Sequence, residues 1–425
     1  MAVNNRWGIA AAGFLMQMAL GAVYAWSVFR TPLTDRFHWS ISQVTLTFTI
    51  CIFVLGVSAF FGGLWLNKSG PRIVALTAGL LYGLGVFLAS YSGIGLWWLY
   101  LTYGLIGGVG LGFGYIVPVA VLLKWFPDRR GLAAGATAAG FGAGAAITVV
   151  PIANMIAASG YQSAFFTFGI GQGVIVLALA FFLRKPSQAM PAKKKQLNLP
   201  QTKIDFTPPQ VLRSPIFWVM YLVFVMVAAG GLMTAAQIAP IAHDFKIADA
   251  PVGILGFQMA ALTFAISLDR IFDGFGRPFF GWVSDHIGRE HTMFIAFGTA
   301  ALMLLTLSVY GHIPIVFVLA TAVYFGVFGE IYSLFPATSG DTFGVKFATT
   351  NNGMLYTAKG TASLLVPLAS LVAASYGWQA VFVIAVALNA TAALLALFVI
   401  KPMRRAFILG NEATASARAR DVRAA

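Results

Sequence analysis

Two cationic residues lie inside stretches of sequence that are otherwise apolar enough to cross a membrane. Arg277 lies in LDRIFDGFGRPFFGW, and Lys359 lies in MLYTAKGTASLLVPLASLV. A charge in hydrocarbon is costly, so such a residue usually faces a cavity and has a function there. Arginine offers a planar fork that matches a carboxylate, whereas lysine offers a point charge. The pair therefore predicts a site for a small anion with two charged ends.

The two cations are expected at matching depth in the membrane. Arg277 lies eight residues before Asp285, which marks the expected cytoplasmic end of its helix, and Lys359 lies eight residues after Asn351. Eight helical residues place a side chain roughly 12 Å from the end of its helix. Matched cations on different helices are suited to one small anion between them.

The same apolar segments hold further charged residues, namely Asp269, Arg270, Asp273 and Glu330. Arg270, Asp273 and Arg277 share one helical face through their spacing. Arg270 can therefore pair with Asp269 or Asp273, which leaves Arg277 and Lys359 for a substrate. Glu330 then needs a partner or holds a proton. In the alternative interpretation, every cation is neutralised by an acid and only joins helices.

Composition identifies the class of protein. The 425 residues are 59% apolar and 9% charged, and the mean hydropathy is +0.83. Apolar runs long enough to cross a hydrocarbon core of about 30 Å recur along the whole chain. Backbone in lipid must bond within its own segment, so each run is expected to be a helix. We predict an all-α integral membrane protein with twelve transmembrane helices, at 7–29, 43–66, 73–93, 96–123, 131–157, 162–183, 216–242, 252–283, 291–311, 313–337, 351–375 and 377–400.

The distribution of charge predicts the orientation in the membrane. The formal net charge is +14, and most of the 27 Lys and Arg residues fall in alternate loops, a central linker and the C-terminal tail. Because basic loops stay on the cytoplasmic side, both termini are expected in the cytoplasm. The expected location is the cell membrane, which is the inner membrane in a bacterium. The lipid bilayer explains the basic character, so no nucleic acid partner is expected.

Neither a cofactor nor a metal site is predicted. Cys51 is the one cysteine of the chain, which excludes an intramolecular disulfide and a metal site built on cysteines. His286 and His291 are close in sequence, but they lie in a short basic loop that reads as a solvated surface. No nucleophile–base arrangement is recognisable, so catalytic residues are not expected and the chain is not an enzyme.

The chain is a duplicated pair of six-helix units. The hydrophilic stretch 184–215 contains a run of three lysines and Pro208-Pro209, which indicates a linker. It separates an N-terminal bundle, 1–183, from a C-terminal bundle, 216–400, which a cytoplasmic tail, 401–425, follows. One constant offset relates Gly63 to Gly281, Pro118 to Pro336 and Gly135 to Gly353. Repeats of this kind are a transporter architecture with the substrate between the halves.

The loops GLWLNKSGPR and GWVSDHIGR occupy equivalent places in the two halves, and they resemble the duplicated signature of the major facilitator superfamily. The first copy departs from it, with Asn67 in place of the usual acid and Pro71 in place of a base. The resemblance implies that these loops gate the inner side and lock helices together. The implied gating residues are Gly63, Asn67, Gly70, Arg72, Gly281, Asp285, Gly288 and Arg289.

Several longer stretches resemble the oxalate/formate antiporter family over nearly the whole chain. They are GAVYAWSVFRTPL, KWFPDRRGLAAGATAAGFGAG, GRPFFGWVSDHIGR, YSLFPATSGDTFG and LYTAKGTAS. This resemblance implies that Arg277 and Lys359 bind the two carboxylates of oxalate. Aromatic residues of the same helices can wall off water and donate hydrogen bonds to a carboxylate. The candidates are Tyr24, Trp26, Tyr115, Phe328, Tyr332 and Tyr356.

These observations favour a carrier that moves small carboxylates by alternating access as a monomer, with oxalate exchanged for formate. The spacing of Asp273 and Arg277 also resembles the proton-coupled monocarboxylate transporters. A carboxylate beside a substrate arginine can take up a proton when substrate loads, so symport of lactate, pyruvate or a similar anion is the alternative. An anion receptor that resembles a transporter, without turnover, is a third hypothesis.

Overall fold

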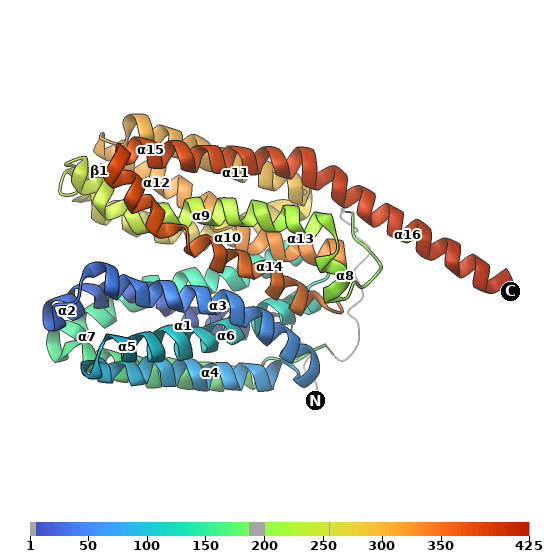
Figure 1. Cartoon of the computed structure of the whole chain (residues 1–425), viewed down its shortest axis with the longest axis horizontal. Coiled ribbons are helices and arrows are strands. Elements are labelled where there is room, and N and C mark those ends of the chain that lie inside the picture. The colour runs from blue at the N-terminus through green and yellow to red at the C-terminus, as the bar shows by residue number, and fades with distance from the viewer. Residues whose placement is uncertain (1–5, 187–199, 255, 425) are drawn as a thin grey trace.

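The computed structural model describes residues 6–186, 200–254 and 256–424 of the chain. Two helical bundles lie side by side, with the N-terminal helices in blue to cyan and the C-terminal helices in green to red (Figure 1). Both chain ends and helix α8 lie at the same end of the bundles, which we call the terminal face. The opposite end, where β1 and α2 lie, is called the far face.

The N-terminal bundle runs from Arg6 to Ala180. Its helices are α1 (Arg6–Gly21), η1 (Ala22–Trp26), α2 (Ser27–Phe37), α3 (Ile41–Ser69), α4 (Pro71–Leu88), η2 (Ala89–Ile94), α5 (Leu96–Leu99), η3 (Tyr100–Gly107), α6 (Gly108–Trp125) and α7 (Arg130–Ala180). The C-terminal bundle follows with α8 (Pro208–Leu212), α9 (Pro215–Asp244), β1 (Pro251–Ile254), β2 (Phe257–Ala260), α10 (Ala261–Ile287), α11 (Arg289–Tyr310), α12 (Pro314–Phe328), α13 (Ile331–Phe343), α14 (Ala348–Ser363), α15 (Val366–Leu395), η4 (Ala396–Ile400) and α16 (Lys401–Ala424).

Nine helices in the described part of the chain are long and apolar enough to span a membrane, and they are consistent with twelve spans. The 51 residues of α7 contain two spans, because Gly160 breaks the helix with a φ of 81°. Helix α15 is broken in the same way at Gly377, where φ is 76°. Helix α10 is absent from the nine although it has spanning length, because its buried charges lower its hydropathy.

The first part of the span predicted at 252–283 is wrong. Residues 251–254 and 257–260 pair as the two strands of an antiparallel hairpin, in which Pro251 pairs with Ala260 and Ile254 with Phe257. Gly256 in the turn has a φ of 85°, a conformation that glycine adopts without strain. Helix α10 therefore begins only at Ala261. The hairpin is a small exception to the predicted all-α architecture.

Glycines bring neighbouring helices into close backbone contact. A methyl group on Gly108 would come within 2.9 Å of the Cys51 carbonyl of α3, and one on Gly140 would overlap the Phe14 carbonyl of α1. Substitution at either position would thus force the helices apart. This agrees with the general use of small residues at helix interfaces in membranes.

The two bundles touch each other mainly through α7 against α10 and α3 against α14. Gly131 of α7 lies so close to Gly281 of α10 that neither has room for a side chain. Gly63 of α3 lies in the same way against the Thr349 carbonyl of α14, at 2.8 Å from an added methyl. These contacts close the terminal face between the bundles.

Candidate functional site

Arg277 is paired with an acid of its own helix. Its Nε lies 3.2 Å from Asp273 Oδ1, and its Nη2 lies 2.6 Å from Asp273 Oδ2. Its Nη1 donates to the Ala138 carbonyl of α7 at 2.5 Å. The guanidinium is buried, with 2% of the residue exposed. The fork that was predicted to bind a carboxylate of the substrate therefore holds a carboxylate of the protein in this structure.

The predicted pairing of Arg270 with Asp273 is consequently wrong, and Arg270 acts on Asp269 electrostatically without forming an ion pair. Arg270 forms no ion pair with any described residue, whereas Asp273 is held by Arg277. Both arginines lie within helical reach of Asp273, but only Arg277 is also held by the Ala138 carbonyl of α7. Asp269 is buried, and its Oδ1 has no hydrogen-bond partner in the described structure.

Lys359 lies in a cage of aromatic side chains. Its ammonium donates to the hydroxyls of Tyr24 at 2.8 Å and Tyr356 at 3.1 Å. It also lies 4.8 Å from the ring centre of Tyr332 and 5.3 Å from that of Phe141. Only 1% of Lys359 is exposed, and no carboxylate among the described residues pairs with it. The rings stabilise the cation through their π faces, but its charge is not cancelled.

Tyr332 connects the two cations. The guanidinium of Arg277 lies 5.1 Å from its ring centre, and the ammonium of Lys359 lies 4.8 Å from the same centre. The Tyr332 hydroxyl is buried without a hydrogen-bond partner in the described part of the chain. The structure thus brings Arg277 and Lys359 to one place between the bundles, with an unused hydroxyl donor beside them.

The remaining aromatic candidates divide into two groups. Tyr115 stacks on Tyr356 with ring centres 4.3 Å apart, so it lines the cage. Trp26 lies elsewhere, against Tyr103 at 4.5 Å in the interior of the N-terminal bundle. Its predicted place in the site is corrected, because a residue two positions after Tyr24 lies roughly 200–240° around the helix from it. Phe328 lies behind Tyr332, at 6.1 Å.

One cage residue was missed by the sequence analysis. Phe141 of α7 meets Tyr24 and Tyr115 edge to face, each with ring centres 5.3 Å apart. It lies in the glycine-rich stretch GFGAG, where the sequence signal indicates close packing of helices. A large ring among three glycines could have been noticed as the one side chain of this stretch able to reach a cavity.

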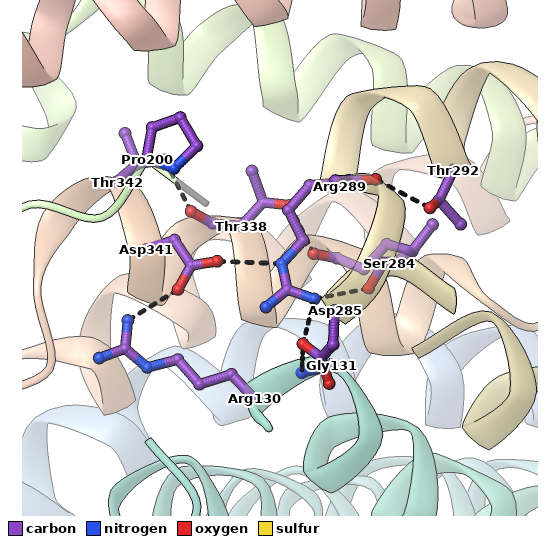
Figure 2. Close-up of polar contacts among 12 residues, drawn as sticks. Arg130, Gly131, Pro200, Ser284, Asp285, Arg289, Thr292, Thr338, Asp341 and Thr342 are labelled. Carbon is purple, nitrogen blue, oxygen red and sulfur yellow. Dashed lines mark hydrogen bonds and ion pairs between the residues drawn. The ribbon is translucent and has the colours of Figure 1, made fainter. Parts of the chain in front are cut away.

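The terminal face is closed by a network of ion pairs (Figure 2). Asp341 of α13 accepts from Arg130 of α7 at 2.8 Å and from Arg289 of α11 at 2.9 Å. Arg289 also pairs with Asp285 at 2.6 Å. All four side chains are buried. Arg130 and Asp341 were not among the predicted gating residues, although both lie in the stretches that carry the family resemblance.

Asp285 holds the start of the opposite bundle's helix. Its two carboxylate oxygens accept from the backbone N–H groups of Gly131, at 3.1 Å, and Leu132, at 3.0 Å. A carboxylate is favoured there because the first amides of a helix have no partner within the helix. Gly288 begins the turn beside it with a φ of 101°, so Asp285 and Arg289 are positioned together.

The equivalent loop of the N-terminal bundle is held more weakly. Asn67 donates one hydrogen bond to the Thr350 hydroxyl of α14 at 2.8 Å. Arg72 donates to the Phe181 carbonyl of its own bundle at 3.2 Å, so it does not reach the other bundle. Gly70 provides the turn, with a φ of 84°. No cluster of three or more potential metal ligands occurs in the described residues.

The chain matches a family model over most of its length. The Major Facilitator Superfamily model matches residues 8–273 and 231–423. The proton:xylose symporter XylE has the same fold, with a TM-score of 0.68 over 92% of this chain and 94% of that one at 13% identity. The transporter FucP gives a TM-score of 0.67 over 91% and 97%, at 15% identity.

Sequence relatives define the branch of the superfamily. The oxalate:formate antiporter of Oxalobacter formigenes is 34% identical over 412 residues, which cover 95% of this chain and 93% of that protein. Human monocarboxylate transporter 7 is 30% identical over 135 residues, 32% of this chain and 26% of that protein. The chain is a multi-pass membrane transporter that belongs to the major facilitator superfamily, in the family of the oxalate:formate antiporter.

Proposed function

We propose that the chain exchanges small carboxylate anions across the membrane, with oxalate and formate as its substrates. The observation that carries the proposal is the uncompensated Lys359, which lies beside Arg277 over the same Tyr332 ring. An ammonium whose charge is not cancelled at a buried position attracts an anion strongly, because water does not screen it there. The relative that is 34% identical over 412 residues is named for oxalate and formate.

Substrate binding would change the partners of both cations. A carboxylate near Lys359 could replace the hydroxyls of Tyr24 and Tyr356, which now accept from its ammonium. The second carboxylate of oxalate would reach Arg277 by sharing the guanidinium with Asp273. The hydroxyls of Tyr332 and Tyr115, which are buried without partners in the described residues, would donate to the anion.

We further propose that residues 1–183 and 216–400 act as two units around this site, in a monomer, with the terminal face in the cytoplasm. The contacts between the bundles lie at the level of the cations or on the terminal side of them. Exchange requires these contacts to open while others form at the far face. Asp285, Arg289 and their partners would then hold the state that is closed to the cytoplasm.

A second candidate function rests on the Asp273–Arg277 ion pair. Because Asp273 cancels the charge of Arg277, one positive charge remains in the site, and a single carboxylate would neutralise it. Proton-linked transport of a monocarboxylate such as lactate or pyruvate fits this charge balance. Monocarboxylate transporters are relatives over about a third of the chain.

Purified protein in liposomes would separate the candidates. Vesicles loaded with unlabelled oxalate should take up labelled oxalate, vesicles without internal anion should take up far less, and internal formate should support the same uptake. Uptake of lactate that needs a pH gradient and no internal anion would instead establish the second candidate. Binding of oxalate without any uptake would identify a receptor.

Lys359→Gln tests the assignment of the site. Removing the charge should weaken oxalate binding by about 100-fold, since a hydrogen-bonded buried charge contributes about 3 kcal/mol. Lys346→Gln is the matched control, because Lys346 is an exposed lysine of the terminal face. Equal oxalate affinity in the two variants would refute the role of Lys359.

A further inference from the structure

Glu330 is a buried acid without a partner. It lies at the break between α12, which ends at Phe328, and α13, which begins at Ile331. It is 0% exposed, and neither carboxyl oxygen has a hydrogen-bond partner among the described residues. No cation pairs with it in the described structure, in contrast to Asp273.

A charged carboxylate is expensive in such a place. Burial of an ion without a counter-ion or hydrogen bonds costs several kcal/mol, and an acid avoids the cost when it takes up a proton. The ionisable groups that act on Glu330 are Asp273 and Arg277 from α10 and Tyr324 from α12. Asp273 and Arg277 are already paired with each other. Burial without a partner therefore favours the neutral form of Glu330, with a proton bound to the carboxyl.

The helix break ties Glu330 to the anion site. A methyl group on Gly329 would overlap Asp273 Oδ1 and come within 2.7 Å of Arg277 Nε, so the backbone beside Glu330 lies directly on the ion pair. Two residues after Glu330 the chain carries Tyr332, the ring that faces both cations. A change of charge at Glu330 and the binding of an anion at Arg277 and Lys359 thus act on the same short segment.

We propose that Glu330 is a proton-binding site that gives this carrier a second, proton-linked mode of transport. The inference rests on the proposed carboxylate exchange. Water on one side of the membrane supplies the proton to Glu330 as the anion binds at Lys359. On the other side the anion and the proton both leave to water. The empty carrier returns after Glu330 has released its proton, so that one proton crosses the membrane with each anion.

The proposal separates the proton site from the ion pair on α10. Asp273 cannot release Arg277 without leaving a buried guanidinium unpaired, whereas Glu330 gains or loses its proton without breaking any hydrogen bond of the described structure. Each proton on Glu330 cancels one negative charge of the substrate. Exchange of one anion for another needs no change at Glu330, so exchange and proton-linked transport use different groups.

Transport by Glu330→Gln in liposomes tests this division. With the membrane potential held at zero and no internal anion, an external pH one unit lower should drive wild-type protein to accumulate labelled oxalate about tenfold, for one proton per anion. The variant, which mimics the protonated acid, should show no such accumulation and should still exchange labelled for internal oxalate. Asp35→Asn is the control, since Asp35 is an exposed acid of α2.

The outcomes distinguish the two claims. Accumulation by Glu330→Gln equal to that of wild type, or no accumulation by wild type, overturns the proton site. If the wild-type protein shows no exchange, the proposed function is refuted instead. In that case the infrared carbonyl band of a protonated carboxyl still decides the proton site. The band should be present in purified wild type at neutral pH and missing in Glu330→Gln, and an unchanged band would contradict the proposal.

Discussion

The same loop occurs twice in this molecule and is held in two different ways. In the C-terminal copy, Asp285 accepts from the first amides of α7, and it pairs with Arg289, which also pairs with Asp341. In the N-terminal copy, Asn67 faces Thr350 in the first turn of α14 with one neutral hydrogen bond. Position and partner helix are equivalent, but among the described residues the ion pairs are found at the C-terminal copy only.

The difference indicates that closure of the terminal face depends on one side of the molecule. A neutral hydrogen bond contributes about 1 kcal/mol, whereas breaking a buried ion pair costs about 3–5 kcal/mol. The glycines do not differ in this way, because Gly63 and Gly281 both leave room for the backbone of the opposite bundle. Both copies thus allow the two bundles to approach closely, but the contacts of the C-terminal copy stabilise the closed terminal face more strongly.

Among substitutions that test this comparison, Asp341→Asn should destabilise the closed terminal face most. It leaves Arg130 without its ion pair and weakens Arg289, so the closed terminal face should lose about 3 kcal/mol. A cysteine placed at the buried Ala134, in a Cys51→Ser background, should react with a maleimide from the terminal side about 100 times faster. An unchanged rate would show that the network does not hold the face closed.

Asp285→Asn should have a smaller effect. The amide oxygen can still accept from one backbone N–H of α7, and Arg289 keeps Asp341, so the expected loss is about 1.5 kcal/mol. The same labelling assay should give an increase of about tenfold. A loss as large as that of Asp341→Asn would mean that the carboxylate at the start of α7 is the main lock.

Asn67→Asp should give the smallest change, in the opposite direction. An acid near the first turn of α14 gains about 0.3–1 kcal/mol from the helix terminus. Labelling at position 134 should therefore slow by a factor of about two to five, and oxalate exchange should slow with it. Arg72→Ala is the control, because Arg72 bonds within its own bundle. Faster labelling in Asn67→Asp would contradict the equivalence of the two loops.

Much of the architecture could be predicted because hydrophobicity in a membrane is a local property. Runs of apolar residues, basic loops and the repeated offset required no knowledge of contacts. The hairpin at 251–260 could not be separated from the span that follows it, since both are apolar. The position of Trp26, by contrast, could have been predicted from helical spacing, because it lies two residues after Tyr24 and so on another side of the helix.

For the anion site, residue type and depth selected Arg277 and Lys359 as candidates, and the family resemblance added the tyrosines. Residue type and depth were not sufficient to pair the charges. Arg270 and Arg277 both lie within reach of Asp273 by helical spacing, and only the packing of α10 against α7, where Arg277 also meets the Ala138 carbonyl, distinguishes them. Phe141 joined the site for the same reason, from a helix whose sequence indicates packing.

The sequence by itself determined that this chain spans a membrane as two related halves and that two cations lie between them, because the cost of charge in hydrocarbon is large wherever the helix lies. The tertiary structure decided which charges cancel. Asp273 meets Arg277, aromatic rings surround Lys359, and Glu330 is left without a partner in the described structure. Pairing depends on distances of a few ångström between side chains of different helices, and helical spacing within one segment does not fix them.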